Sequence, residues 1–198
     1  MGSSVDTPTA KSFRQFSPDQ DFTDGALASG RAVIRQEASA LFELADELNA
    51  DFDAAVRLLL ATERRVVVTG MGKSGHIGRK IAATLAATGT PSFFVHPAEA
   101  AHGDLGMLTP GDCLLVLSNS GSTPEIRSIV MHARSLHVPI VSIASRSGSP
   151  LARQSDVFLC LPQAEEACPV RIAPTTSTTM MLALGDALAI AAMRIRGI

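Results

Sequence analysis

A glycine-rich loop follows the first apolar run of the chain and contains a lysine and a serine. It reads Gly70-Met71-Gly72-Lys73-Ser74-Gly75-His76. Its G-x-G-x-x-G spacing is typical of dinucleotide sites, but no acidic residue ends the next strand, where the ribose of NAD would need one. A P-loop is excluded because Val67 stands where its first glycine would be. Free N–H groups and the helix dipole favour one phosphate or a similar small anion. The alternative is a tight strand–helix turn with Ser74 as its N-cap.

A second polar loop precedes a helix further along the chain. It reads Ser118-Asn119-Ser120-Gly121-Ser122-Thr123-Pro124-Glu125. A plain turn needs only one or two such side chains, so this density of hydroxyls indicates an anion held by hydroxyl and main-chain N–H groups. Pro124 suits the first helical position. Glu125 is either a functional carboxylate or, with Ser122, a capping box that only closes the helix.

Two further loops carry side chains that could take part in chemistry. His96, Glu99, His102 and Asp104 follow the second strand, where they form a polar lining for a sugar-sized ligand or plain surface. The spacing of the two histidines is not typical of a metal site. After the fifth strand, Glu165 and Glu166 are either a source of a general base or solvated surface charge.

Short apolar runs and helical patterns alternate around these loops. Strands are predicted over residues 66–70, 92–95, 113–117, 139–144 and 157–161, and helices over 74–88, 124–136, 150–154 and 176–196. This alternation predicts an α/β fold, a five-stranded parallel sheet in an αβα sandwich of the flavodoxin or Rossmann type. Ligands bind at the carboxyl ends of such strands, where these loops lie.

The N-terminal part of the chain has a different pattern. Residues 1–22 are predicted to be a flexible tail, and residues 23–198 one domain with an α/β core over 64–198. A helical segment with an apolar seam comes first, and a short helix at residues 52–62 follows. The seam comprises Ile34, Ala38, Leu41, Ala45 and Leu48. It either packs on its own domain or forms a dimer contact.

Composition excludes several classes of function. The 198 residues are 46% hydrophobic and 18% charged, with a net charge of −2, which excludes general disorder and a non-specific nucleic-acid surface. Three cysteines form no CxxC, so neither a disulfide framework nor a zinc knuckle is expected. No secretory signal is recognised, and Gly185 and Asp186 interrupt the longest apolar stretch. A cytoplasmic protein without membrane contact is expected.

Together these segments resemble the sugar isomerase (SIS) domain and, within it, the D-arabinose 5-phosphate isomerases. The resemblance covers residues 25–198 and rests on GMGKSGHIGRKIAATLAATGTPSFFVHPAEAAHGDLGM, SNSGSTPEI, LHVPIVSI, EEACP and APTTSTTMMLALGDALA. It implies the SIS fold and the interconversion of D-ribulose 5-phosphate and D-arabinose 5-phosphate through a cis-enediol(ate). The product would feed synthesis of 3-deoxy-D-manno-octulosonate for lipopolysaccharide or capsule. No cofactor is required.

The resemblance also implies roles for particular residues. Lys73, Glu125 and Glu166 match its catalytic positions, and which glutamate is the base stays open. Substrate or phosphate positions are matched by Ser74, Gly89, Thr90, His96, His102, Ser118, Asn119, Ser120 and Thr123. His96 is also the expected ligand of an adventitious or inhibitory zinc ion. A homodimer or homotetramer is implied.

This chain departs from the family pattern in two ways. The family carries a further catalytic histidine in a Ser-His-Pro-Gly-Gly segment after the terminal helix, and tandem CBS domains follow. Here the sequence stops at Ile198 and contains no histidine after His137. A fragment of a longer protein is expected, or else a domain with impaired turnover. Two alternative functions remain, a non-catalytic sugar-phosphate sensor and an isomerase of another sugar phosphate.

Overall fold

The computed structural model describes residues 25–170 and 172–198. The predicted tail at residues 1–22 lies outside the described residues. Within them the chain divides after Arg35, so the first part of helix α1 (Ala26–Asp46) belongs to one unit and residues 36–198 form the other.

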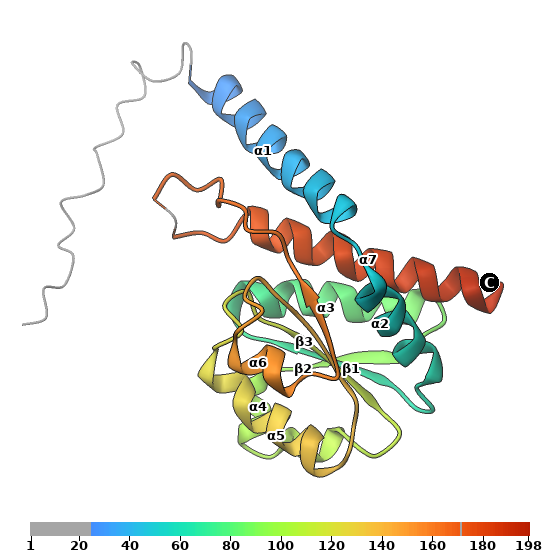
Figure 1. Ribbon diagram of the computed structural model, residues 1–198. Coiled ribbons are helices and arrows are strands. Elements are labelled where there is room, and N and C mark those ends of the chain that lie inside the picture. The colour runs from blue at the N-terminus through green and yellow to red at the C-terminus, as the bar shows by residue number, and fades with distance from the viewer. Residues whose placement is uncertain (1–24, 171) are drawn as a thin grey trace, which may run out of the picture. The chain divides into compact units, whose positions relative to one another are not determined.

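A five-stranded parallel sheet forms the centre of the larger unit (Figure 1). Its strands are β1 (Val66–Gly70), β2 (Ser92–Val95), β3 (Cys113–Leu117), β4 (Ile140–Ala144) and β5 (Val157–Cys160), in the order β2-β1-β3-β4-β5. Every residue of β1, β3 and β4 is buried, as continuous apolar runs predict. Val68 pairs with Phe94 on one side and with Leu115 on the other, so the loops after β1, β2 and β3 leave from one edge of the sheet. The predicted fold class is confirmed.

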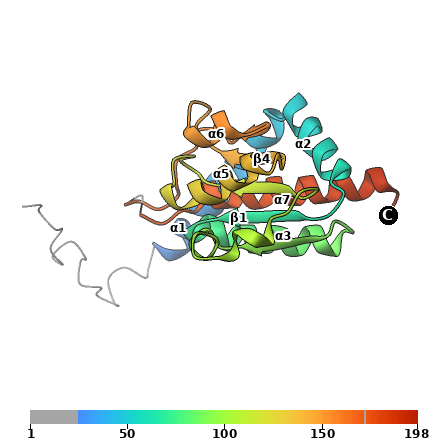
Figure 2. The same ribbon diagram turned by 90° about the horizontal axis from the view of Figure 1, so that it is seen from below.

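Helices cover both faces of this sheet (Figures 1 and 2). One face is covered by α2 (Ala50–Ala61), α3 (Gly72–Ala87) and α7 (Thr176–Arg196). The other is covered by α4 (Pro97–Ala101), the 3₁₀ turn η3 (Pro124–Ile126), α5 (Arg127–Ser135) and α6 (Pro150–Gln154). A further 3₁₀ turn, η2 (Asp104–Met107), follows α4.

Helices α3 and α7 run side by side in the same direction. A Cβ atom added at Gly185 would lie 2.4 Å from the Ile81 side chain, which shows how closely the two helices approach. Lys80 pairs with Asp186 beside this contact, and Arg196 donates to the Thr90 hydroxyl near the C-terminal ends. The N-terminal turns of both helices therefore lie at the same end, the carboxyl edge of the sheet.

Helix α7 is long and apolar enough to cross a membrane by length and composition, the one such helix among the described residues. Its contacts assign it to the core of the domain instead. Met181, Leu184 and Leu188 are buried in the core cluster on the α2–α3 face of the sheet.

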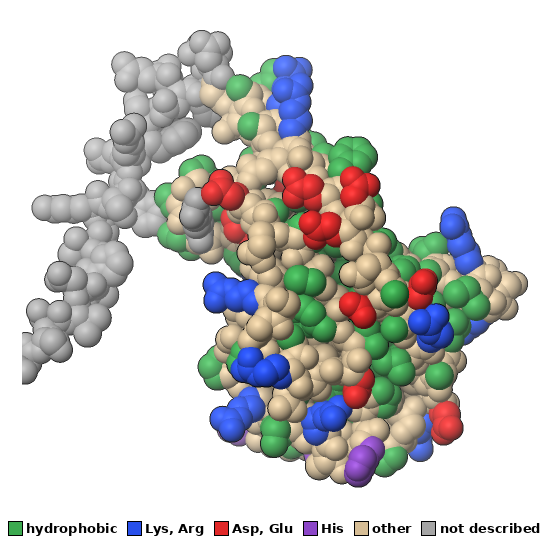
Figure 3. Space-filling view, in the orientation of Figure 1, with side chains coloured by type: hydrophobic (Ala, Val, Ile, Leu, Met, Phe, Trp, Pro, Cys, Tyr) green, Lys and Arg blue, Asp and Glu red, His purple; other side chains and the backbone are tan. Residues whose placement is uncertain are grey.

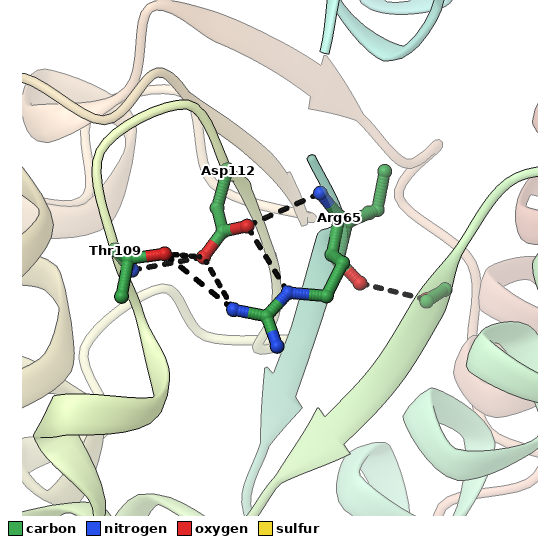
Figure 4. Close-up of polar contacts among 5 residues, drawn as sticks. Arg65, Thr109 and Asp112 are labelled. Carbon is green, nitrogen blue, oxygen red and sulfur yellow. Dashed lines mark hydrogen bonds and ion pairs between the residues drawn. The ribbon is translucent and has the colours of Figure 1, made fainter. Parts of the chain in front are cut away.

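The opposite, amino edge of the sheet is fixed by a buried carboxylate (Figure 4). Asp112 is 1% exposed and precedes β3. It accepts hydrogen bonds from the main-chain N–H groups of Thr109, at 2.8 Å, and Arg65, at 3.1 Å, and forms an ion pair with the Arg65 guanidinium. The bonds link the start of β1 to the start of β3, which satisfies the buried charge.

Of the two alternatives for the apolar seam of α1, packing on its own domain does not hold for the whole seam, although Leu41 does pack against the core. Ile34 and Leu48 are 69% and 42% exposed, and Ala45 is exposed as well. The buried residues of α1 are Ala40 and Leu44, one turn apart, because the domain offers a contact surface to a single narrow stripe of the helix. The predicted internal packing of the whole seam is therefore not formed.

Candidate active site

The loop between β1 and α3 brings a lysine and a serine to the carboxyl edge of the sheet. A Cβ atom at Gly75 would lie 2.4 Å from the Gly70 carbonyl oxygen, and one at Gly70 would lie 2.9 Å from the Leu117 carbonyl oxygen. Only glycine allows the first turn of α3 to approach the strand ends this closely. Lys73 is exposed and Ser74 is half-buried in that turn.

The alternative in which Ser74 is the N-cap of α3 is wrong. The helix begins at Gly72, which has φ +58°, and Met71 is the N-cap without a capping side-chain bond. A glycine in a left-handed conformation lets the chain turn into the helix one residue after the strand ends. Ser74 therefore lies inside the first turn, and its hydroxyl is not used as a cap.

The loop after β3 is held in one conformation by its own hydrogen bonds. Ser118 is buried, and its hydroxyl lies 2.8 Å from that of Thr123 and accepts from the Gly121 N–H at 3.2 Å. Asn119 accepts at its carbonyl from the main-chain N–H of Ser145 at 2.9 Å and from its hydroxyl at 2.8 Å. These bonds fix the backbone of the loop. They do not involve the side chain of Asn119, which is exposed.

Glu125 is exposed and follows this loop directly. The predicted capping box is wrong, because the Ser122 hydroxyl donates to the Ser120 carbonyl at 3.4 Å. The chain enters a 3₁₀ turn at Pro124, which moves the N-cap to Thr123. The Thr123 hydroxyl is paired with Ser118, so no side chain caps this turn and the Glu125 carboxylate is not used by a capping box.

The Ser120 hydroxyl accepts from the Ser122 N–H at 3.2 Å. This bond uses a lone pair of Ser120 and leaves its O–H available to donate to an anion. The half-buried Ser120 thus resembles Ser74, because each presents a hydroxyl at the carboxyl edge of the sheet.

The two histidines of the loop after β2 flank a short helix. His96 is half-buried and caps α4, its Nδ1 accepting from the Ala98 N–H at 3.3 Å. His102 ends the same helix and is exposed. The structure therefore gives His96 a capping role that the sequence analysis did not identify, and it leaves the imidazole edge bearing Nε2 outside this bond.

His96 does not provide a zinc site by itself. The described residues contain no group of three or more His, Cys, Asp and Glu side chains that could hold a metal ion. Because Nδ1 accepts a hydrogen bond, the ring proton of a neutral His96 is on Nε2. A metal on Nε2 would displace that proton and disturb the cap of α4, so the residues present do not fit the expected ion.

Glu166 is held at the N-terminus of α7. Its Oε2 accepts from the Thr175 N–H at 2.7 Å, the Thr175 hydroxyl at 3.1 Å and the Ser177 N–H at 3.3 Å. Burial would raise the pKa of Glu166, but the hydrogen bonds from Ser177 and Thr175 outweigh it and lower the pKa below its usual value. A run of Thr and Ser before a helix is typical of residues whose own side chains cap it. Thr175 occupies the N-cap position of α7, but the carboxylate of Glu166 accepts the hydrogen bonds from the free N–H groups at this N-terminus.

Two predicted residues lie away from the others. Gly89 and Thr90 follow α3 and precede β2, at the amino edge of the sheet. The Thr90 hydroxyl accepts from Arg196, and a Cβ atom at Gly89 would lie 2.9 Å from Ile198. Within one chain the structure does not bring them to the loops at the carboxyl edge.

Basic side chains gather near the loop after β3, over α5 and α6 in the lower part of Figure 3. The exposed arginines near this loop are Arg127, Arg146 and Arg153, whereas Arg134 lies in the last turn of α5 and is paired with Asp156. A cleft of about 450 Å³ lies between η3–α5 and α6, lined in part by Thr123, Arg127 and Arg153. Positive charge at this place attracts an anionic substrate toward the hydroxyl-rich loop.

Comparison with known proteins gives this arrangement a family. The profile of the SIS domain matches residues 59–191. Arabinose 5-phosphate isomerase KdsD of Shigella flexneri is 52% identical over 169 residues, 85% of this chain and 52% of that protein. KdsD of Pseudomonas aeruginosa is 53% identical over 171 residues, 86% of this chain and 52% of that protein. The chain thus spans about half the length of these curated relatives.

A solved structure agrees with the fold and its loops. The c3406 protein of Escherichia coli CFT073, in complex with arabinose 5-phosphate, superposes with a TM-score of 0.83 at 37% identity, covering 86% of this chain and 91% of that one. The family match includes the loops after β1, β2, β3 and β5 together with α3 and most of α7. The chain belongs to the SIS domain family.

Proposed function

We propose that the chain is the catalytic domain of an aldose–ketose isomerase that interconverts D-ribulose 5-phosphate and D-arabinose 5-phosphate. The observation that carries this proposal is that a phosphate-binding type of loop and candidate catalytic side chains lie at the same edge of the sheet. A hydroxyl-rich loop that suits phosphate lies there with Lys73 and two glutamates. The curated relatives named arabinose 5-phosphate isomerase and the solved structure with bound arabinose 5-phosphate support it.

The phosphate of the substrate would bind between the loop after β3 and the first turn of α3. Ser74, Ser118, Asn119, Ser120 and Thr123 are the proposed phosphate-binding residues. Free N–H groups at the start of α3 and its dipole add to the attraction of these hydroxyls. Binding of the phosphate away from the reacting carbons fixes their orientation.

The reaction transfers one proton between neighbouring carbons. A carboxylate removes a proton from C1 of the ketose and returns it to C2, and a cis-enediolate lies between the two steps. The proton of the O1 hydroxyl passes to O2, so that C1 becomes the aldehyde and C2 the alcohol. Glu125 and Glu166 are the candidate bases, and Lys73 stabilises the negative charge of the enediolate. His96 and His102 are proposed to contact substrate hydroxyls.

We further propose that this domain needs no redox cofactor or metal, acts in the cytoplasm on a pentose 5-phosphate, and contacts neither nucleic acid nor membrane. A homodimer or homotetramer is proposed as well. Exposed apolar side chains support it, since Phe42 of α1 is 74% exposed and Ile195 of α7 is 67% exposed. The product would supply 3-deoxy-D-manno-octulosonate synthesis.

The test is turnover of D-ribulose 5-phosphate by the purified chain in D₂O, followed by NMR. Isomerisation through an enediolate with solvent exchange predicts D-arabinose 5-phosphate carrying deuterium at C2. Turnover that Lys73→Ala abolishes, and that Lys80→Ala does not, supports the proposal. Binding without any product at high protein concentration contradicts it and favours a sensor. Faster turnover of a six- or seven-carbon phosphate would contradict the substrate assignment.

A further inference from the structure

We propose that Thr175 is a positioning residue, which uses its main-chain N–H and its hydroxyl to hold the Glu166 carboxylate at the N-terminus of α7 for the isomerase reaction. This inference rests on the proposed function, in which Glu166 is one of two candidate bases. It assigns a role to a residue that lies outside the catalytic and substrate-binding sets derived from the sequence.

The Thr175 hydroxyl links two groups of the loop that carries Glu166. It donates to Glu166 Oε2 at 3.1 Å and accepts from the Ala167 N–H at 2.8 Å. A hydroxyl with both a donor and an acceptor partner has a fixed direction. Valine has the same shape and offers neither bond, whereas serine offers both.

The N-terminus of α7 provides the remaining bonds. The first N–H groups of a helix have no partner within it, and the Thr175 and Ser177 N–H groups donate to Glu166 Oε2 at 2.7 and 3.3 Å. The carboxylate is thus the cap of a 21-residue helix, where the helix dipole favours its negative charge. Because α3 and α7 are parallel, this end of α7 lies beside the turn that contains Lys73.

The surroundings of Glu166 stabilise its ionised form mainly through hydrogen bonds. Burial acts against ionisation, and the bonds from Ser177 and Thr175 more than compensate for it, so that the pKa of Glu166 is lowered. No charged side chain of the described residues contributes to this pKa shift. The titratable groups on the same loop are Glu165 and Cys168, and Lys73 is the charged residue in the first turn of α3, whereas Lys80 lies further along α3 and is paired with Asp186.

A titration of the Glu166 carboxyl carbon by ¹³C NMR tests the positioning without any need for turnover. The signal is assigned by its loss in Glu166→Gln. In Thr175→Val the pKa of Glu166 is expected to rise toward its usual value, since a hydrogen bond to the charged carboxylate is lost. Thr175→Ser is expected to keep the wild-type pKa. Thr178→Val is the matched control, because the Thr178 hydroxyl donates only to carbonyl groups of Pro174 and Thr175.

An unchanged pKa in Thr175→Val, or the same rise in Thr178→Val, would overturn the inference. Thr175→Ser keeps the test decisive if the valine variant does not fold, because serine must then retain both the fold and the lowered pKa. Loss of the lowered pKa in Thr175→Ser would overturn it as well.

The pH dependence of kcat/KM then tests whether the positioning serves the reaction. The acid limb of the profile is expected to move to higher pH in Thr175→Val by the same amount as the pKa of Glu166, and serine is expected to restore it. A uniform loss at every pH would indicate a purely structural role and overturn this part. If the wild-type chain does not isomerise D-ribulose 5-phosphate at all, the proposed function fails, while the NMR titration still decides the positioning.

Discussion

The charged side chains of the proposed site differ in how firmly their surroundings hold them. Glu166 accepts three hydrogen bonds at one oxygen, whereas Lys73 is exposed in the first turn of α3. A side chain that the fold does not use can be removed at little cost in stability. Lys73 therefore allows catalysis and folding to be separated.

Lys73→Ala is expected to reduce kcat/KM for D-ribulose 5-phosphate by about 10²–10³-fold, the loss typical of removing one group that stabilises an oxyanion. The midpoint of thermal unfolding is expected to stay near that of the wild type. Lys80→Ala is the control, since Lys80 lies on the same helix and pairs with Asp186 instead. Near-normal turnover by Lys73→Ala would rule out the electrostatic role.

Ser120→Ala is expected to weaken substrate binding more than it slows the chemical step. Loss of one hydroxyl donor to a phosphate should raise KM roughly tenfold or more and leave kcat within a few-fold. Ser122→Ala is the matched control, because the Ser122 hydroxyl makes only a long 3.4 Å bond to the Ser120 carbonyl. An unchanged KM, measured by initial rates, would count against a phosphate site in this loop.

Residue types and spacing predicted the polar loops, but hydrogen bonds decided how their members are used. A run of Thr and Ser before a helix predicts capping by those residues, yet Thr175 and Ser177 donate to Glu166 from nine and eleven residues away in the chain. The same limit applies to His96, whose capping bond to Ala98 depends on the backbone angle at the end of β2. Such contacts follow from the fold and not from local pattern.

Among the elements, the buried strands were the most predictable. Continuous apolar runs place β1, β2 and β3 at the predicted residues, and β4 and β5 within one residue. Helix starts were less predictable, as α3 begins two residues early on a positive-φ glycine and the helix expected at 124–136 begins as a 3₁₀ turn. The buried stripe of α1 was missed because it depends on what the rest of the domain offers to the helix.

The contact between α3 and α7 makes a prediction at this scale. Gly185→Ala is expected to destabilise the domain by about 1–3 kcal/mol, because the new methyl group would lie 2.4 Å from Ile81 and overpack the interface. Gly30→Ala is the control, since a Cβ atom there meets nothing within 4 Å. Urea denaturation measures both variants.

A double variant tests whether contact with Ile81 causes the loss of stability in Gly185→Ala. The double variant Gly185→Ala/Ile81→Ala should lose less stability than the sum of the losses in the two single variants. The smaller side chain at position 81 leaves room for the new methyl group, and that methyl group fills part of the space left by Ile81. Strict additivity would mean that the close approach of α3 and α7 does not limit substitution at Gly185.

For the molecule as a whole, one parallel sheet explains why the site forms where it does. Five strands that run in the same direction end at one edge, and the same edge receives the N-termini of α3 and α7. Side chains that are far apart in the sequence, between residues 70 and 177, thus lie close together at this edge. The core that holds this edge together includes a cysteine, Cys113, which lies at the start of the central strand β3 and is fully buried.

The buried thiol of Cys113 is expected to lower the stability of the domain at alkaline pH. Burial raises the pKa of the Cys113 thiol from 9.0 to about 12, and the charges of Asp156 and Asp112 add to the shift against an opposing bond from Thr62. Between these values the unfolded chain loses the proton and the native chain keeps it. The free energy of unfolding should therefore fall as pH rises above 9, by up to about 1.4 kcal/mol per pH unit from this group.

Urea unfolding at pH 8, 9.5 and 10.5 measures this effect against two variants. Cys113→Ala, although less stable at every pH, should lose the part of the slope that comes from Cys113. Cys160→Ser should keep that part and lose only a smaller one, because partial burial and the charge of Glu47 also raise the pKa of the Cys160 thiol. Equal slopes for the wild type and Cys113→Ala would mean that the buried thiol is not coupled to the fold. A larger loss of slope in Cys113→Ala than in Cys160→Ser would show that the Cys113 thiol becomes exposed to solvent when the domain unfolds.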